Sequence, residues 1–501
     1  MGKKAAFLAL AALNLDRDKP TALHRQLYDQ LRQAILSKRL FPGTRLPPTR
    51  ALALDLAVSR NTVVTAFEQL LAEGYVEGRV GDGTYVSTSL SDSVMRFHVK
   101  KKVPPKARAT DAPLSKRGTL IAKTPIIPGS TGMNPRAFRL GLPAVDEFPF
   151  DIWRRLAGRR WRLITSAALA YGDSRGYLPL RKTIAAYLGA SRGVRCEADQ
   201  VIVTSGSQSA LDLTARLLLD PGDTVWMEDP GYRGARTALM VAGARLIPVP
   251  IDSDGLQVDV GIKKAPDARL VYVTPSNQFP RGVTMSLPRR LALLEWANRS
   301  RSWIVEDDYD SEYRYSGRPL TALQGLDTAD RVVYIGTFSK VLFPSLRLGY
   351  AVVPQGLVDA FATARYIVDR QSPTLDQIIL TDFITEGHFV RHLRRMRSLY
   401  ASRRAVLVAA IQRDMGDLLE VTSGEAGLHV LALLRAEMDD REISRRAAQR
   451  GIEASALSES ALTPPARGGL VLGYAAIAEQ EIPEAIRRLK DGMVSLKPAR
   501  R

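Results

Sequence analysis

Short apolar segments that alternate with helical patterns constrain the fold of this chain more than any other feature. These segments lie at residues 201–203, 224–227, 246–249, 270–273, 304–305, 332–335 and 350–353. Helical periodicity separates several of them, for example over residues 209–219. Strands joined by helices run parallel, and helices cover both faces of such a sheet. We therefore predict an α/β fold with a mostly parallel sheet, followed by long helices such as residues 392–410 and a smaller α/β lobe.

One lysine follows the apolar segment at residues 332–335. A cation is costly to bury at the end of a strand, whereas a neutral amine there can form a Schiff base with an aldehyde cofactor. Thr337, Ser339 and Arg347 flank Lys340 in the sequence and offer donors for the phosphate of such a cofactor. An isolated Ser-Lys pair is more often a solvated loop. The interpretation therefore depends on a second segment.

That second segment, residues 303–305, is apolar and ends in acids. Asp307 and Tyr309 point to the same side, because side chains alternate along a strand. Pyridoxal phosphate needs a carboxylate that keeps its ring nitrogen protonated and a partner for its phenolic oxygen. Acids at a strand end can equally bind a divalent metal. In combination with Lys340, we favour the pyridoxal phosphate interpretation and predict no metal site.

From about residue 130 onward, further motifs resemble the fold-type-I aminotransferases. In chain order they are Tyr171-Gly172-Asp173-Ser174-Arg175-Gly176, Val203-Thr204-Ser205-Gly206-Ser207-Gln208, Asp229-Pro230-Gly231-Tyr232 and Thr274-Pro275-Ser276-Asn277-Gln278-Phe279-Pro280. The resemblance implies that the cofactor is pyridoxal 5′-phosphate, held on Lys340 as an internal aldimine. It also implies that Tyr232 stacks on the pyridine ring, Asn277 contacts the phenolic oxygen and Tyr171 reaches the neighbouring subunit's phosphate. The implied phosphate site comprises Gly206, Ser207, Gln208, Thr337, Ser339 and Arg347.

The first 88 residues carry a separate helical pattern. A stripe of Leu23, Leu27, Leu31 and Ile35 predicts a first helix. A short helix over residues 49–56 follows, and Ser59 is a plausible N-cap for a third helix over residues 60–73 that Gly74 ends. The predicted inner face of this third helix comprises Val63, Phe67, Leu70 and Leu71. Two short strands at residues 75–76 and 84–86, joined by a turn, complete a winged helix-turn-helix over residues 19–88.

The polar residues of this head predict how it contacts DNA. Arg60, Asn61 and Thr62 face outward from the first turn of the third helix, where recognition helices contact base edges in the major groove. Arg50 is placed to reach a phosphate or a guanine. Arg79 and Gly81 belong to the wing, which could approach the DNA backbone. Much of residues 19–88 closely resembles the GntR-type DNA-binding signature, which implies double-stranded operator DNA as a partner.

Charge and composition separate the head from the body. The formal net charge of +19 favours a nucleic-acid partner but does not locate a DNA site. Residues 89–135 are basic, contain proline and show no sustained apolar periodicity. We interpret them as a linker that would span about 35–40 Å as a flexible coil. The predicted division is therefore a DNA-binding domain at 19–88, a linker at 89–135 and a pyridoxal-phosphate-binding effector domain at 136–501.

Other sequence features bear on the compartment. No apolar run approaches the roughly 20 residues of a membrane helix, and the apolar stretch near the start lacks the small-residue cleavage site of a secretory signal. The single cysteine, Cys196, cannot form an intramolecular disulfide and suits a reducing compartment. We expect a cytoplasmic protein that does not span a membrane.

Together the two halves resemble the MocR/GabR-type regulators, in which a GntR-like head is fused to an aminotransferase-like body. The resemblance implies a transcriptional regulator that senses pyridoxal phosphate itself or an amino-acid-type effector. It also implies a head-to-tail homodimer in which each head crosses to the other subunit.

Two alternatives remain: an active aminotransferase with an appended DNA-binding domain, and a DNA-binding structural protein whose body has lost its cofactor. One departure from the aminotransferase pattern weighs against the first. Aminotransferases bind the substrate α-carboxylate through an arginine. We expect this arginine two residues before Gly473, where this chain has Val471. Arg467 is a weaker candidate for that role. Without such an arginine, an amino-acid substrate would lose a charge-assisted ion pair with its carboxylate. Full transamination is therefore doubtful, although a half-reaction is compatible with the other motifs.

Overall fold

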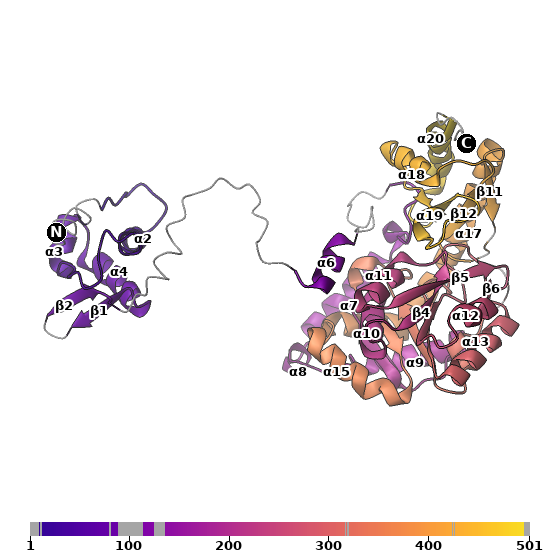
Figure 1. The fold of residues 1–501 in the computed structure, drawn as a ribbon, viewed down its shortest axis with the longest axis horizontal. Helices are drawn as coiled ribbons and strands as arrows, with labels where there is room; N and C mark the ends of the chain where they lie inside the picture. Colours follow the sequence, from indigo (N-terminus) through magenta and orange to yellow (C-terminus); the bar gives the residue numbers. More distant parts are fainter. Residues whose placement is uncertain are drawn as a thin grey trace. The chain divides into compact units, whose positions relative to one another are not determined.

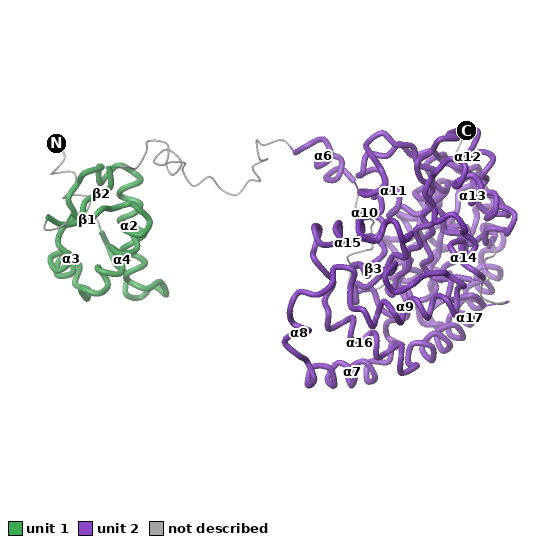
Figure 2. The backbone as a smooth tube through the Cα atoms, turned by 90° about the horizontal axis from the view of Figure 1, so that it is seen from below, with its two compact units in different colours: residues 1–113 green, residues 114–501 purple. Residues whose placement is uncertain are grey.

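The computed structural model describes residues 10, 13–79, 82–88, 114–124, 136–315, 317, 320–422, 424 and 426–494. The chain forms two compact units, Met1–Pro113 and Leu114–Arg501 (Figure 2). Gly81 of the predicted wing, and residues 89–113 and 125–135 of the predicted linker, lie outside the described residues. Within the range predicted as linker, helix α6 (Lys116–Lys123) belongs to the second unit.

The first unit is a small helical domain with one hairpin. It contains α2 (Leu23–Leu36), α3 (Thr49–Asp55), α4 (Arg60–Ala72), β1 (Val76–Arg79) and β2 (Gly83–Val86), and the two strands are antiparallel. The Ser59 hydroxyl accepts a hydrogen bond from the Thr62 amide at 3.1 Å, so it caps α4 as predicted. Gly74 follows this helix with φ at +75°. This order of elements confirms the predicted winged helix-turn-helix.

The predicted inner face of α4 is wrong at one residue. Leu71 is 50% exposed, whereas Val63, Ala66, Phe67 and Leu70 are buried. Successive residues on an α-helix are rotated by about 100°. Leu71 therefore lies beside the buried stripe, and Ala66 takes the inner position that the sequence pattern did not assign.

The second unit is organised around an eight-stranded sheet in the order β3-β10-β9-β8-β7-β4-β5-β6. Its strands are β3 (Val201–Thr204), β4 (Thr224–Asp229), β5 (Arg245–Asp252), β6 (Gly255–Leu256), β7 (Leu270–Val273), β8 (Trp303–Asp308), β9 (Val332–Thr337) and β10 (Gly349–Val352). The antiparallel pairs are β3–β10, β10–β9 and β5–β6, while the central strands pair in parallel. The prediction of a mostly parallel sheet is confirmed.

Helices cover both faces of this sheet (Figure 1). The helices of this part of the second unit are α7 (Phe150–Arg162), α8 (Ser166–Leu169), α9 (Leu178–Arg192), α10 (Ser207–Leu218), α11 (Arg233–Ala242), α12 (Val258–Lys264), α13 (Leu287–Ser300), α14 (Leu323–Leu326), α15 (Val358–Asp369) and α16 (Thr374–Thr385). Among them, α7 and α8 pack on α16. Alternate residues of β4 show the two layers. Val225 and Met227 share a core with α10 and α11, whereas Trp226 stacks on Trp296 of α13 with ring centroids 3.8 Å apart. Strands buried on both faces must be apolar throughout.

The small lobe follows α17 (His388–Met415), which is longer at both ends than the predicted helix at 392–410. It has an antiparallel sheet in the order β11-β12-β14-β13, formed by β11 (Leu419–Thr422), β12 (His429–Leu434), β13 (Ser455–Ala456) and β14 (Gly469–Gly473). Its helices are α18 (Asp440–Gln449), α19 (Leu457–Ser460) and α20 (Ile482–Val494). In the described part of the chain, we find no helix with the length and apolar character needed to cross a membrane.

Candidate functional site

The predicted cofactor residues gather where parallel strands end. Lys340 follows β9, Asp307 is the last residue but one of β8, Asn277 follows β7, Tyr232 follows β4 and Gly206 follows β3. The carboxyl ends of parallel strands lie along one edge of a sheet, which is where such folds bind ligands. Motifs that are widely separated in the sequence are therefore brought to one edge.

Lys340 has the environment of a reactive amine. Its Nζ donates a hydrogen bond to the carbonyl oxygen of Gly141 at 2.7 Å. Burial lowers the pKa of the Lys340 amine, while the carboxylates of Asp310 and Asp307 oppose part of that change. A lower pKa increases the neutral, nucleophilic fraction of a lysine.

Asp307 presents a buried oxygen without a partner. The side chain is 4% exposed, and its Oδ2 accepts a hydrogen bond from the Tyr272 hydroxyl at 2.8 Å. Its Oδ1 is buried and has no hydrogen-bond partner among the described residues. Burial raises the pKa of Asp307 to about 6. A buried acceptor of this kind is costly unless a donor reaches it, and the protonated ring nitrogen of pyridoxal phosphate is a donor of the right kind.

Asn277 and Tyr309 lie together, as the prediction for the phenolic oxygen requires. The Tyr309 hydroxyl donates to the backbone oxygen of Asn277 at 3.0 Å, and Asn277 Nδ2 lies 3.2 Å from the same hydroxyl. The Nδ2 atom also lies 3.0 Å from each carboxylate oxygen of Asp310. This Asp310 contact was missed in the sequence, where Asp310 was one of several acids in a row.

The residues predicted to hold the phosphate lie around the start of α10. Gly206 precedes this helix with φ at +93°, and a Cβ there would lie 3.1 Å from the guanidinium of Arg347. Arg347 Nη2 donates to the Ser205 carbonyl at 2.6 Å, and the Ser339 amide donates to Thr337 Oγ1 at 3.2 Å. A helix N-terminus with a nearby arginine suits a phosphate. Ser207 begins the helix, whereas Gln208 is exposed and its amide donates to the Gly234 carbonyl at 3.0 Å.

The two predicted aromatic contacts differ in their setting. Tyr232 caps α11 and packs edge to face on Phe279, with centroids 6.0 Å apart. Burial raises its pKa to about 12, so it remains a neutral phenol. Tyr171 is 83% exposed and has the guanidinium of Arg370 over its ring at 5.5 Å. Tyr171 is therefore accessible on the surface of the second unit.

The segment that carries Tyr232 is also bonded to the small lobe. Asp229 accepts hydrogen bonds from the amides of Leu462 and Thr463 at 2.7 and 3.0 Å. The Gly231 amide donates to the Ser460 carbonyl at 2.9 Å. Arg233 forms an ion pair with Glu459 at 2.8 Å. We call these contacts between residues 229–233 and 459–463 the lobe contact. No sequence signal indicated it, because half of its partners are backbone groups.

The residues considered for substrate carboxylate binding do not form a cationic site. Val471 is buried in an apolar cluster with Leu431 and Leu457. Arg467 forms an ion pair with Glu420 at 2.9 Å and also donates to the Leu434 carbonyl. Val471 therefore presents only hydrocarbon. The Arg467 guanidinium already has an acid and a carbonyl oxygen as partners.

The head places its predicted DNA-contacting residues on α3, α4 and the hairpin. Arg50, Arg60 and Asn61 are exposed. The Thr62 hydroxyl lies 2.9 Å from the Ser59 hydroxyl, so it also contributes to the cap of α4. Arg79 lies over the ring of Tyr85 at 4.4 Å, which fixes it on the hairpin. Its predicted neighbour in the wing, Gly81, is outside the described residues.

The fold and these strand-end residues define an aminotransferase-type cofactor site in a protein with a DNA-binding head. Comparisons with known proteins agree with both parts. The gntR family of bacterial regulatory proteins matches residues 23–86, and the class I and II aminotransferases match residues 145–489. The "Probable rhizopine catabolism regulatory protein MocR" of Rhizobium meliloti is 44% identical over 97% of this chain and 96% of that protein. The pyridoxine biosynthesis transcriptional regulator PdxR of Corynebacterium glutamicum is 31% identical over 97% and 99%.

Solved structures resemble the second unit. The kynurenine aminotransferase of Pyrococcus horikoshii has a TM-score of 0.67 and 29% identity, with 79% of this chain and 98% of that chain covered. The chain therefore belongs to the MocR-type transcriptional regulators, which join a gntR-family head to a class I and II aminotransferase domain. Membership of the aminotransferase family identifies pyridoxal 5′-phosphate as the cofactor. The predictions of family, fold class and cofactor are confirmed.

Proposed function

We propose that this regulator binds pyridoxal 5′-phosphate through Lys340 and changes its affinity for operator DNA in response to that cofactor or to an amino-acid-type effector. The observation that carries the proposal is the buried Oδ1 of Asp307, which no described residue contacts by a hydrogen bond, at the same sheet edge as Lys340. Burial of an amine and of an acceptor without a donor is costly, and one cofactor with an aldehyde and a basic ring nitrogen satisfies both groups. We further propose that the protein acts in the cytoplasm.

Each predicted residue then has a separate task toward the cofactor. Asp307 would hold the ring nitrogen protonated, which makes the ring an electron sink. Tyr309 and Asn277 would hold the phenolic oxygen, and Tyr232 would cover one face of the ring. The phosphate would lie at the start of α10 with Arg347 beside it.

The lobe contact connects the proposed cofactor site to the small lobe. Tyr232 lies within residues 229–233, which are bonded to residues 459–463 of the small lobe. A ligand that changes the position of Tyr232 would therefore change the stability of this contact. A ligand shifts such an equilibrium only as far as its affinity differs between the two states.

The apolar setting of Val471 favours regulation over transamination. A carboxylate would have to be buried against Leu431, Leu457 and Val471 without a cation from these positions. The active aminotransferase is therefore the second candidate. Rapid conversion of the bound cofactor to its amine form by a common amino acid would favour that candidate, and an unchanged absorption spectrum would count against it.

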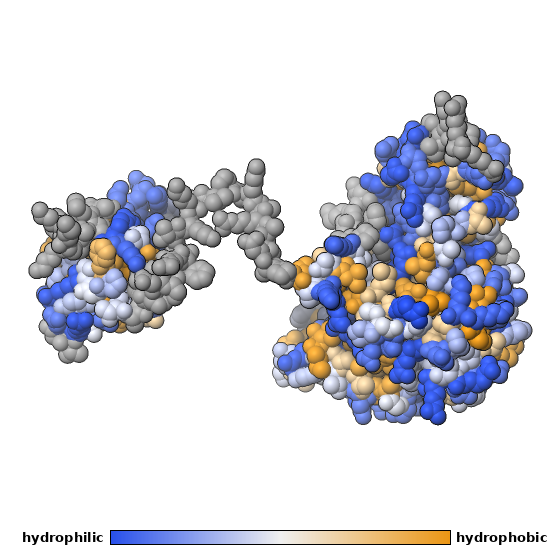
Figure 3. All heavy atoms as spheres, in the orientation of Figure 1, coloured by the Kyte–Doolittle hydropathy of each residue, from blue (hydrophilic) through white to orange (hydrophobic). Residues whose placement is uncertain are grey.

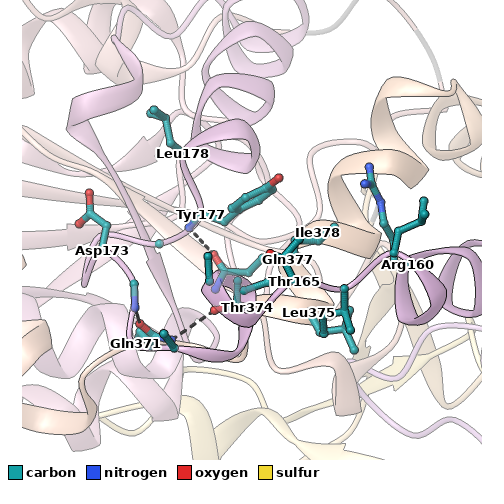
Figure 4. A pocket seen from close by; sticks show the side chains of 17 residues that line it. Arg160, Thr165, Asp173, Tyr177, Leu178, Gln371, Thr374, Leu375, Gln377 and Ile378 are labelled. Atoms are coloured by element: carbon teal, nitrogen blue, oxygen red, sulfur yellow. Dashed lines mark hydrogen bonds between the residues drawn. The ribbon is translucent and has the colours of Figure 1, made fainter.

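We also propose the head-to-tail homodimer, because a large apolar surface of the second unit is exposed. Trp161, Leu163, Leu169 and Tyr171 are all exposed on or beside α7 and α8, and apolar atoms gather over this region (Figure 3). Leu163 also lines a cavity of about 410 Å³ between residues 160–178 and 371–378. Figure 4 shows the side chains around this cavity. Exposed apolar surfaces of this kind usually serve association. A second copy would also bring its own Tyr171 to the interface.

Binding to promoter DNA at fixed salt tests the proposed function. Gel shifts with and without pyridoxal phosphate should give different affinities for the wild type, but equal affinities for Lys340→Ala. Lys263→Ala removes an exposed lysine of α12 and should behave as the wild type. Identical affinities in all samples would contradict the proposal that the protein senses pyridoxal phosphate. Salt is held constant because phosphate contacts make DNA affinity salt-dependent.

A further inference from the structure

One buried acid beside the cofactor site has no role in the function proposed above. Asp310 is 1% exposed, and each of its carboxylate oxygens lies 3.0 Å from Asn277 Nδ2. Gly427 of the small lobe closes over this pair, since a Cβ at Gly427 would lie 2.7 Å from Asp310 Oδ2 and still closer to Asn277 Nδ2. The carboxylate and the amide are therefore held against each other in a confined space.

The chemistry of the two groups determines which way the amide faces. Burial raises the pKa of Asp310, and the hydrogen bond from Asn277 opposes that rise. Both carboxyl oxygens lie at the same 3.0 Å from Asn277 Nδ2, which fits an ionised carboxylate that accepts on each oxygen. A primary amide nitrogen carries two N–H donors, while an ionised carboxylate can only accept. One N–H of Asn277 therefore points at Asp310, and the other is left for the side where Tyr309 Oη lies 3.2 Å away. The amide oxygen, Oδ1, is buried without a partner among the described residues. Nothing on the oxygen side thus holds the amide in this orientation.

Asp310 is consequently the charged group that opposes an amide flip, beside the Tyr309 oxygen, which accepts from the same nitrogen at the longer distance of 3.2 Å. A flip of about 180° would exchange the nitrogen and the oxygen of Asn277 and would turn an acceptor toward the phenolic oxygen of the cofactor. Two acceptors facing each other repel, so the contact would be lost. The carboxylate excludes the flipped state, because it would then face the amide oxygen.

We propose that Asp310 is a positioning residue that orients the Asn277 amide, so that an N–H group faces the phenolic oxygen of the bound cofactor. The inference rests on the proposed binding of pyridoxal phosphate at Lys340. It adds a residue that touches neither the cofactor nor DNA but determines how a contacting residue behaves.

The pKa of the Schiff-base nitrogen, read from visible absorption against pH, reports this orientation. The imine proton partly neutralises the charge of the phenolic oxygen. A hydrogen-bond donor to that oxygen therefore stabilises the deprotonated Schiff base more than the protonated one. Loss of the donor therefore raises this pKa. Loss of the Asp310 charge has the opposite effect, because a nearby anion stabilises the protonated imine.

A double-mutant cycle with Asn277→Ala separates these opposite effects. Asp310→Leu has a similar shape and removes both the charge and the acceptor, whereas Asp310→Asn would supply an amide that pairs with either orientation of Asn277. Without Asn277, Asp310→Leu removes only the charge. The Schiff-base pKa should therefore fall about one pH unit further on that background than in the presence of Asn277, as expected for a hydrogen bond to a charged oxygen. Asp310→Ala replaces the Leu variant if the latter does not fold, with the same expected difference.

The Asn277→Ala background is the control, because the amide donor is absent there whether or not Asp310 is present. Equal changes of the Schiff-base pKa on the two backgrounds would overturn the inference while leaving the proposed function intact. A wild type without any Schiff-base absorption would overturn both.

Discussion

Asp307 is the residue at which cofactor binding and the stability of the cofactor-free protein conflict. Burial raises its pKa to about 6, while one oxygen has no hydrogen-bond partner in the described part of the chain. An acid whose pKa is raised by folding binds its proton more tightly in the folded state. The stability of the cofactor-free protein should therefore decrease as the pH rises from about 4 to about 6, and the full penalty of the carboxylate remains above that range.

Asp307→Asn should accordingly stabilise the cofactor-free protein and weaken cofactor binding. At pH 7.5 the gain should reach up to about 3 kcal/mol, and it should be smaller at pH 5. Thermal unfolding of the cofactor-free proteins at the two pH values measures the gain, and a cofactor titration measures the affinity. Asp267→Asn, at an exposed acid, should change neither. A variant that is less stable than the wild type at pH 7.5 would contradict this account of Asp307.

At the scale of elements, the lobe contact joins the start of α11 to the end of α19. Asp229→Ala removes the acceptor of two backbone amides, and we expect a cost of about 2 kcal/mol to the docking of the lobes. Hydrogen exchange of residues 459–463 should become faster, and the effect of the cofactor on DNA affinity should shrink. Asp212→Ala breaks an exposed ion pair with Arg216 within α10 and should change neither. Unchanged exchange at residues 459–463 would show that the contact does not hold the lobes together.

The recognition helix and the hairpin should contribute to DNA binding in different ways. Asn61→Ala removes a side chain placed for base edges, so it should cost about 1–3 kcal/mol on the operator and little on unrelated DNA. Arg79→Ala should weaken binding to both DNAs alike and reduce the slope of log affinity against log salt by about one. Fluorescence titrations over a range of salt concentrations measure both effects. The prediction fails if the two variants lose the same affinity on the two DNAs.

The sequence predicted elements more reliably than it predicted contacts between them. The apolar strand segments and the cap at Ser59 were recognisable, since they depend on local patterns. The error at Leu71 arose because a run of two leucines does not reveal which one lies on the buried stripe. The contacts of Asp229 could not be predicted, because its partners are backbone amides of the small lobe, which carry no distinctive side chain. The contact of Asp310 with Asn277 was missed because Asp310 is one of several acids in a row.

At the scale of the whole molecule, the proposed dimer explains the exposed apolar surface near α7 and α8. Leu169 is 68% exposed there, so a charge at this position costs a monomer little but disrupts an apolar interface. Leu169→Glu should therefore convert dimer to monomer with little change in thermal stability of the isolated subunit. Light scattering after gel filtration measures the mass. Leu287→Glu, at a second exposed leucine on α13, should remain dimeric. A dimeric Leu169→Glu protein would exclude this surface as the interface.

Reduction with borohydride followed by peptide mass spectrometry tests the central claim most directly. After incubation with pyridoxal phosphate, reduction should leave a stable pyridoxyl group on the peptide that contains Lys340, and Lys340→Ala should carry none at a matched cofactor concentration. Stoichiometric modification at Lys340 is the result this account predicts. An unmodified Lys340 peptide, or label spread equally over surface lysines, would contradict it.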